Sequence, residues 1–261
     1  MVIGVLGGTG TAGREVTAEL RRRGHEAIVL SRSAPADGRS RAVDVTADVS
    51  VAAAMLGVDA VVDVISGKSD VMVDGVARAL RAARRGGATH WVSLSVVGAG
   101  ELPFGYHRLM GEREAVTRAG EVPWSIVRAT QFHTLLGMAF GAAARRGVLP
   151  LLDVPIQPVE VREVAVALAD RVEAGPSRTA EDFAGPRVER LDELATAWTA
   201  AHGMHRLPLR IPAIGKAMRA VRAGGLTSPD APRGTVTFAD WLRAETRSAV
   251  PAGHEEAAGW A

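Results

Sequence analysis

Three regularly spaced glycines stand near the start of the chain. Gly7, Gly10 and Gly13 form the pattern G-x-x-G-x-x-G directly after an apolar run. A strand that leads into a glycine-rich turn and then into a helix is typical of dinucleotide-binding sites. One glycine permits the tight turn, another lets the backbone approach a pyrophosphate, and the third lets the helix pack closely on the sheet. The spacing therefore predicts that the diphosphate of a dinucleotide binds here.

The residues between these glycines suit the same chemistry. Thr9 and Thr11 can donate hydroxyl hydrogen bonds, and the predicted helix begins at Thr11 and continues through Ala12. Unpaired N–H groups at the start of a helix bind anions favourably. We therefore expect Thr9, Thr11 and Ala12 to contact the cofactor together with the glycines. A purely structural turn is the alternative interpretation.

The end of the second predicted strand indicates which dinucleotide is favoured. An acidic residue there would bind the ribose diol of NAD(H). This chain instead has Ser31, Arg32 and Ser33, and the first acidic residue, Asp37, comes later. The guanidinium fork of an arginine suits the additional phosphate of NADP(H). We therefore predict NADP(H) in preference to NAD(H), with a solvated surface role for Arg32 as the alternative.

Two further pairs of residues follow predicted strands and complete the expected cofactor site. Asp44 and Val45 end the third strand, where a carboxylate could accept a hydrogen bond from the adenine amine. A helix-capping role for Asp44 is an equal alternative. Ser66 and Gly67 follow the fourth strand, at the carboxyl edge where cofactors lie in such sheets.

The elements that must position these residues alternate regularly through the first half of the chain. Nearly continuous apolar strands alternate with helices, which indicates a parallel sheet covered on both faces. The predicted fold is α/β, a Rossmann-type doubly wound parallel sheet with a smaller, mostly helical C-terminal part. We assign residues 1–130 to the dinucleotide-binding domain, 131–250 to a substrate-binding part packed on it, and 251–261 to a flexible tail. The predicted strands are 2–7, 27–31, 42–45, 60–65, 91–95 and 124–127, and the predicted helices are 11–23, 49–56, 71–84, 106–118, 135–144, 161–173, 191–201 and 237–245.

Composition excludes several other classes of protein. The 261 residues carry a net charge of +2 and no cysteine, which excludes disulfides and thiolate metal sites. Three arginine clusters, 21–23, 84–85 and 145–146, each precede a glycine, so we interpret them as helix ends rather than as a nucleic-acid surface. The histidines show no metal-ligand spacing, and no apolar run is long enough to span a membrane. We expect a cytoplasmic protein, either a monomer or a homodimer.

Four stretches together resemble atypical short-chain dehydrogenases/reductases of the NmrA-like, NAD(P)H-binding group. They are GGTGTAG at 7–13, WVSLSVVG at 91–98, YHRLMGEREAV at 106–116 and PWSIVRATQFHTLL at 123–136. The resemblance extends into the C-terminal half and covers nearly the whole chain. It is specific for the fold and less specific for a reaction, because this superfamily includes reductases, isomerases, dehydratases and sensors.

The resemblance implies a catalytic tyrosine, and one residue departs from the family pattern. The family pairs a tyrosine with a lysine four residues later on the same helix face. Here Tyr106 matches, whereas Met110 replaces the lysine. A nearby lysine lowers the pKa of the tyrosine from about 10 and holds the nicotinamide ribose, and a thioether does neither. Arg113 lies on the same face but roughly 10 Å further along the axis, which is too far for it to replace the lysine. Lys68, after the fourth strand, could reach in from another direction, with a solvated loop lysine as the commoner alternative.

The resemblance also implies residues around the reacting groups. Ser95, at the end of the fifth predicted strand, is the candidate catalytic serine, and a backbone or capping role is the alternative. Ala129 and Thr130 would lie against the nicotinamide. The residues that would face the substrate are Gln131, Phe132 and His133, although a structural role for His133 is the commoner case.

Three functions are compatible with this sequence. The first is an NADP(H)-dependent reductase of a small apolar carbonyl or enone, in which Tyr106 donates the proton. Because Tyr106 lacks the lysine, it should stay protonated at neutral pH, which favours reduction over alcohol oxidation. The second is a cofactor-binding sensor without chemistry, and the third is a non-redox isomerase or dehydratase on the same scaffold.

Overall fold

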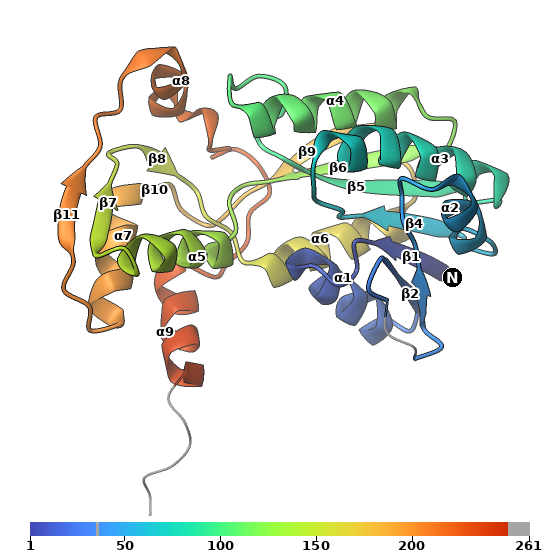
Figure 1. Cartoon of the computed structure of the whole chain (residues 1–261), viewed down its shortest axis with the longest axis horizontal. Coiled ribbons are helices and arrows are strands. Elements are labelled where there is room, and N and C mark those ends of the chain that lie inside the picture. Colours follow the sequence, from blue (N-terminus) through green and yellow to red (C-terminus); the bar gives the residue numbers. More distant parts are fainter. Residues whose placement is uncertain (35–36, 250–261) are drawn as a thin grey trace, which may run out of the picture.

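A seven-stranded parallel sheet forms the centre of the molecule, with helices on both faces (Figure 1). This computed structural model describes residues 1–34 and 37–249, so the predicted flexible tail, 251–261, lies outside the described residues. The strands follow the order β3-β2-β1-β4-β5-β6-β9. Their bounds are β1 (Val2–Leu6), β2 (Glu26–Ser31), β3 (Ser40–Ala42), β4 (Ala60–Asp63), β5 (His90–Val96), β6 (Trp124–Ala129) and β9 (Ala180–Phe183).

The order of the strands reverses direction at β1. From β1 the chain moves outward to β2 and β3, then returns to the other side of β1 with β4, β5 and β6. A crevice forms outside the carboxyl ends of the strands at such a switch point, and ligands bind there in open α/β sheets. The glycine-rich turn follows β1 directly, so the topology places it in that crevice.

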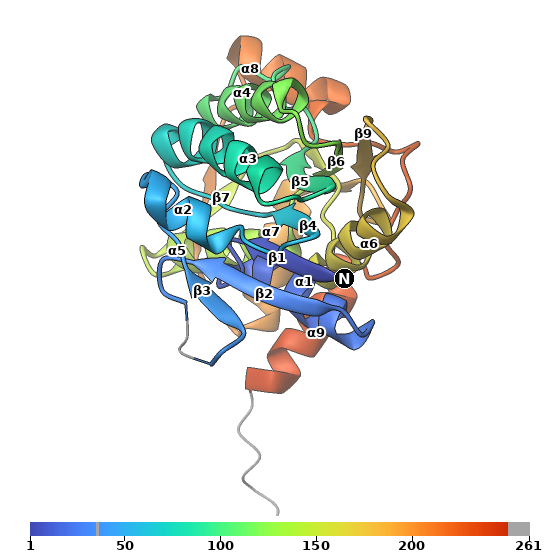
Figure 2. The same cartoon turned by 90° about the vertical axis from the view of Figure 1, so that its right-hand side faces the viewer.

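Five helices cover the sheet. In Figure 2, α2 (Asp48–Ala54), α3 (Val76–Arg85) and α4 (Gly105–Ala119) lie over one face, while α1 (Thr11–Arg22) and α6 (Val161–Ala174) lie over the other. Each face buries its own apolar cluster, one around Leu6, Val61 and Trp91 and one around Val5, Val16 and Leu168. Burial on both faces explains why the central strands are almost continuously apolar.

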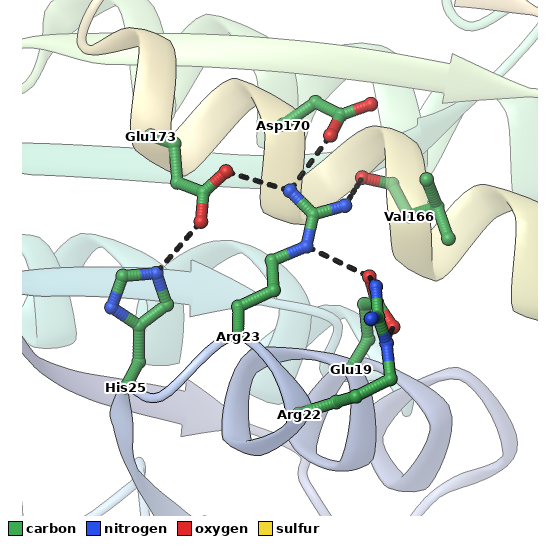
Figure 3. Close-up of polar contacts among 7 residues, drawn as sticks. All are labelled: Glu19, Arg22, Arg23, His25, Val166, Asp170 and Glu173. Carbon is green, nitrogen blue, oxygen red and sulfur yellow. Dashed lines mark hydrogen bonds and ion pairs between the residues drawn. The ribbon is translucent and has the colours of Figure 1, made fainter.

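Helices α1 and α6 are joined by a network of charged side chains (Figure 3). Arg23, the residue that caps the end of α1, directs its guanidinium at Glu19 in α1 and at Asp170 and Glu173 in α6, each at 2.7 Å. The imidazole of His25 lies 3.0 Å from Glu173. These contacts connect the helix that starts at the glycine-rich turn to a helix from the second half of the chain.

The arginine–glycine clusters end helices, as the sequence predicted. Gly24 and Gly147 adopt φ of 82° and 81°, the left-handed conformation that glycine permits. The third cluster differs, because Gly86 stays right-handed with φ of −74° and the next residue, Gly87, reverses the chain with φ of 91°. A Cβ on Gly86 would lie 2.5 Å from the carbonyl oxygen of Met55, so close packing is what requires glycine there.

The smaller C-terminal part occupies the left of Figure 1 and combines helices with short strands. Its core gathers apolar side chains such as Phe140, Trp198 and Phe238. The sequence predicted three of its helices but none of its two-stranded pairs, β8 with β10 and β7 with β11. Its elements are α5 (His133–Ala144), β7 (Val148–Leu151), β8 (Pro155–Ile156), β10 (Glu189–Arg190), α7 (Leu191–Ala201), β11 (Leu207–Arg210), α8 (Gly215–Ala220), η2 (Val221–Gly225) and α9 (Phe238–Ala249).

Two elements from residues 131–250 belong to the central sheet rather than to this smaller part. Strand β9 pairs in parallel with β6, and α6 packs on α1 and on the sheet. The chain therefore leaves the sheet after β6, returns for α6 and β9, and leaves it again. A division at residue 130 separates elements that pack together.

Candidate cofactor and active site

The glycine-rich turn has no room for side chains at its first and third glycines. Gly7 adopts φ of 85°, and a Cβ there would lie 2.8 Å from the Cα of Ile65. A Cβ on Gly13 would lie 2.2 Å from the carbonyl oxygen of Gly7 and 2.6 Å from the Cα of Gly8. Helix α1 therefore packs directly on the turn, and its first N–H groups lie at the crevice. This backbone arrangement suits a diphosphate.

The predicted phosphate and ribose contacts gather beside this turn. The hydroxyl groups of Thr9 and Ser31 lie 2.8 Å apart, which joins the turn to the end of β2. Arg32 and Ser33 follow and are exposed, as are Gly10 and Thr11, while Ala12 is buried in the first turn of α1. The positive charge of Arg32 lies at the carboxyl edge, next to the predicted phosphate site.

Asp44 and Val45 lie in the loop between β3 and α2. Asp44 is exposed and accepts hydrogen bonds from the backbone N–H and the hydroxyl of Thr46, which lower the pKa of its carboxyl group. Helix α2 is capped at Ala47, so Asp44 is not its N-cap. Val45 is buried, and its carbonyl oxygen accepts a hydrogen bond from Arg78. The strand here ends at Ala42, earlier than predicted.

Ser66 and Gly67 are exposed in the loop that follows β4. The residues before them pack against the glycine-rich turn, since Val64 O and Ile65 Cα both approach Gly7. After this loop the chain enters η1 (Asp70–Gly75), a π-helical turn that continues into α3. The predicted cofactor residues from β1, β2 and β4 therefore share one edge of the sheet.

Tyr106 lies in the first turn of α4 and is 51% exposed. The protein around it still withdraws enough water to raise the pKa of Tyr106, and the charge of Arg113 lowers it by less. Met110, one turn later, is 2% exposed and packs with Met72 and Ala99. The position that holds lysine in the family is therefore part of an apolar cluster.

Ser95 is buried and binds a carboxylate of α4. It is 2% exposed, and its hydroxyl donates a 2.6 Å hydrogen bond to Glu114. Glu114 comes eight residues after Tyr106 in α4, about 12 Å further along the helix axis. Glu114 also binds Arg118 and Arg128, both at 2.7 Å, and the hydrogen bond from Arg128 lowers its pKa against the effect of burial. No spacing in the sequence marks Glu114 as the partner of Ser95, and among the described residues the Ser95 hydroxyl binds Glu114 rather than Tyr106.

The segment after β6 crosses from the sheet into the C-terminal part. Ala129 and Thr130 are buried, and the Thr130 hydroxyl accepts a hydrogen bond from the backbone N–H of Gly185. Gln131 donates to the carbonyl oxygen of Leu226 at 3.2 Å, while its own amide oxygen is buried without a hydrogen bond among the described residues. Half-buried Phe132 pairs with Val159. Gln131 therefore lies at the junction of the two parts.

His133 is fully buried at the start of α5. Its Nε2 lies 3.1 Å from the carbonyl oxygen of Val236, and its ring packs on Phe238 and Trp241. Burial lowers the pKa of the imidazole, which favours the neutral ring. In this structure the contacts of His133 hold the start of α9 against α5.

Neither a metal site nor a membrane span is found among the residues that the structure describes. No three histidine, aspartate or glutamate side chains in 1–34 and 37–249 gather closely enough to bind a metal ion. No helix within the same ranges combines the length and apolarity that crossing a bilayer requires.

The fold and the glycine-rich crevice define a Rossmann-type protein, the class in which dinucleotides bind at this edge of the sheet. Residues 7–135 match the family model described as NAD(P)H-binding. A (4-alkanoyl-5-oxo-2,5-dihydrofuran-3-yl)methyl phosphate reductase from Streptomyces griseus is 33% identical over 193 residues, which cover 70% of this chain and 67% of that protein. The chain belongs to the NAD(P)H-binding, NmrA-like family of atypical short-chain dehydrogenases/reductases.

Solved structures share the fold across nearly the whole chain. An NADPH-dependent quinone oxidoreductase from Escherichia coli, solved with NADPH, aligns with a TM-score of 0.77 at 19% identity, covering 93% of this chain and 99% of that one. A superfamily member from Agrobacterium tumefaciens with bound NAD aligns with a TM-score of 0.71 at 18% identity, covering 95% and 97%. Since one neighbour holds NADPH and the other NAD, the fold by itself does not select between the two cofactors.

Proposed function

We propose that this protein is an NADPH-dependent reductase of a small apolar carbonyl or enone, with Tyr106 as the proton donor. The proposal rests on one observation: the glycine-rich turn and the predicted cofactor residues from β1, β2 and β4 lie at the same edge of the sheet. The turn at Gly7 and Gly13 excludes side chains, and the only tyrosine in the chain stands half-exposed at the start of α4. A backbone cradle and a proton donor are what carbonyl reduction requires from the protein.

The residues that would hold the cofactor are the ones gathered at this edge. The backbone at Gly7, Gly10 and Gly13, with Thr9 and Thr11, would bind the diphosphate, and Arg32 would bind the 2′-phosphate. When bound, a reduced nicotinamide supplies a hydride to an electrophilic carbon. Other predicted contacts come from Ser31, Ser33, Asp44, Val45, Ser66, Gly67, Ala129 and Thr130.

Tyr106 would donate its phenolic proton to the oxygen on which negative charge develops. The raised pKa of Tyr106 keeps the phenol protonated throughout the neutral range, so the group is ready to donate. The reverse reaction needs the phenolate, which forms only at strongly alkaline pH. We therefore expect reduction to be insensitive to the ionisation of Tyr106 below about pH 9, and alcohol oxidation to rise as the pH increases.

The name of the relative from Streptomyces griseus supports the enone part of the proposed substrate class but not its apolar character. That name describes reduction of an alkanoyl oxo-dihydrofuran that carries a methyl phosphate group, a compound whose carbonyl groups are conjugated with a ring double bond. A conjugated carbonyl of this kind is an enone, the class proposed here. The residue proposed to contact such a substrate is Gln131, because its amide oxygen is buried at the junction of the two parts without a hydrogen bond among the described residues.

Removing the hydroxyl of Tyr106 tests the proposal. We expect Tyr106→Phe to lower kcat/KM for an enone panel by about 100-fold or more, because general acid catalysis contributes on that scale. NADPH binding, measured by fluorescence titration, should stay within about twofold, because the phenol has no assigned role in binding. Thr196→Val, which removes an exposed hydroxyl from α7, is the matched control. Undiminished activity in Tyr106→Phe would remove this residue from the mechanism.

One observation favours a second function, a cofactor-binding sensor without chemistry. Met110 fills the family's lysine position with a buried apolar side chain, and Ser95 is bound by Glu114. Both features remove groups that assist Tyr106 in the family pattern. Tight NADPH binding without consumption of NADPH, across a broad carbonyl panel, would support the sensor and contradict the reductase.

A further inference from the structure

A fully buried ion pair lies beneath the cofactor edge. Asp63, the last residue of β4, is 0% exposed, and Arg113 of α4 is 3% exposed. The Nη2 and Nε atoms of Arg113 lie 2.6 Å and 3.1 Å from Oδ2 of Asp63. Burying two charges costs solvation free energy unless the pair satisfies its other hydrogen-bonding groups as well. The remaining contacts of Arg113 therefore indicate what this pair does.

The other donors of Arg113 bind backbone at the end of β4. Nη2 donates to the carbonyl oxygen of Asp63, and Nη1 donates to the carbonyl oxygen of Ile65, both at 3.0 Å. The backbone N–H of Ile65 donates to Oδ1 of Asp63 at 3.2 Å. One planar guanidinium thus holds a carboxylate and two carbonyl groups, which a single ammonium could not do with the same geometry.

The backbone held by Arg113 forms a wall of the glycine-rich turn. A Cβ on Gly7 would lie 2.8 Å from the Cα of Ile65 and 3.0 Å from the carbonyl oxygen of Val64. The next residues, Ser66 and Gly67, are exposed at the carboxyl edge. A displacement of Ile65 would therefore move both the turn and the loop that follows β4.

The same side chain fixes the helix that carries Tyr106. Arg113 comes seven residues after Tyr106, about two helical turns or 10 Å along the axis, so both lie on one face of α4. Between them, Met110 packs on Met72 of η1. Because the guanidinium is bound at β4, it sets the rotation of α4 and hence the direction of Tyr106.

We infer that Arg113 is a positioning residue for the reaction, which holds residues 63–67 against the glycine-rich turn and aligns Tyr106 with the cofactor crevice. In this chain the guanidinium of Arg113, which lies beneath the crevice, helps to align Tyr106 with the cofactor. The inference rests on the proposed function, since it presupposes NADPH in the crevice and Tyr106 as the donor.

Two variants test this role. Arg113→Lys keeps the charge but loses the fork, and the double variant Asp63→Asn/Arg113→Met removes both charges together so that neither is left buried alone. We expect the Kd for NADPH to rise about fivefold or more in Arg113→Lys and about tenfold or more in the double variant. At saturating NADPH, kcat for an enone should fall by at least a similar factor, because Tyr106 is no longer aligned. Arg23→Met, which breaks the α1–α6 network far from the crevice, is the control for a general loss of stability.

The outcomes separate the inference from the proposed function. If the wild-type protein does not bind NADPH, the proposed function fails. If the wild type binds NADPH but both Arg113 variants bind it equally well with unchanged kcat, the positioning role is wrong. An equal weakening in Arg23→Met would also overturn it, because stability alone would then explain the result.

A measurement on the wild-type protein keeps the inference testable if the variants fail to fold. Hydrogen exchange followed by mass spectrometry should show that NADPH protects residues 63–70 and the first half of α4 together. Protection of the loop after β4 without any change in residues 105–114 would show that the two are not coupled through Arg113.

Discussion

Met110 shows how a change in one residue is accommodated by its neighbours. It packs with Met72 and Ala99 and is 2% exposed, so a lysine in this position would have to bury its ammonium group or displace η1. Burial of an unpaired ammonium is unfavourable and lowers its pKa. The packing around residue 110 is therefore adapted to methionine. Burial raises the pKa of Tyr106, and in the proposed reductase this would favour reduction over alcohol oxidation.

Arg32 should decide the choice of cofactor. It is exposed beside the Thr9–Ser31 contact, and a charged hydrogen bond to the 2′-phosphate of NADPH would contribute about 1.5–3 kcal/mol. We expect Arg32→Ala to raise the Kd for NADPH about 10–100-fold and to change the Kd for NADH little. Arg39→Ala, at the amino end of β3, is the control. An equal change in the Kd for NADPH and for NADH, measured by fluorescence titration, would show that Arg32 does not bind the 2′-phosphate.

Gly13 should tolerate no side chain. Its Cβ would overlap the backbone of Gly7 and Gly8, so Gly13→Ala must push α1 away from the turn. Overpacking of this kind costs about 1–3 kcal/mol of stability, and we expect NADPH binding to weaken about tenfold or more as well, because the phosphate cradle moves. Gly141→Ala in α5 is the matched control, since its Cβ would make only ordinary contacts of 3.5 Å or longer. Unchanged binding and melting temperature in Gly13→Ala would contradict the geometry described here.

At the scale of elements, helix α1 contacts a different part of the structure at each of its two ends. Its first residues form the cofactor crevice, and its last turn is attached to α6 by Arg23 (Figure 3). Arg23 is 13% exposed and contacts three carboxylates, whereas the neighbouring Arg22 is 70% exposed and contacts only Glu19 among them. The two arginines therefore offer a direct comparison between an interhelical network and a surface ion pair.

The α1–α6 network should contribute measurable stability that depends on pH. We expect Arg23→Ala to lower the free energy of unfolding by about 1 kcal/mol near pH 7, and Arg22→Ala to have a clearly smaller effect because its ion pair is solvent-exposed. Hydrogen bonds from Arg22 and Arg23 lower the pKa of Glu19 from 4.5 to about 2. A depressed carboxyl pKa contributes stability above about pH 4.5 that is lost as the pH falls towards 2. Thermal melts should show the effect of Arg23→Ala shrinking over that interval, and a constant difference would contradict this account.

At the scale of the whole molecule, the sheet joins segments that are distant in the sequence. Strand β9 pairs with β6 after an intervening excursion through α5, β7, β8 and α6. The sequence did not predict β9, because Ala180–Phe183 contains two acidic residues and lacks the apolar character of a central strand. An edge strand that pairs on one side needs fewer apolar residues, so periodicity is a weak signal for it. The pairs β8–β10 and β7–β11 were missed for a different reason: their strands are only two to four residues long, and proline in β7, β8 and β11 argues against a strand.

The sequence by itself determined the parallel sheet, its glycine-rich turn and the edge at which the predicted cofactor residues lie. These features depend on local spacing, since glycine placement and alternating apolar segments act within one strand–turn–helix unit. Only the tertiary structure decided what the polar side chains contact. Glu114 binds Ser95, Asp63 binds Arg113 and Val236 binds His133, across separations of 19, 50 and 103 residues. Such pairings depend on which buried polar group the folded chain leaves within hydrogen-bonding distance, and no spacing rule in the sequence encodes that.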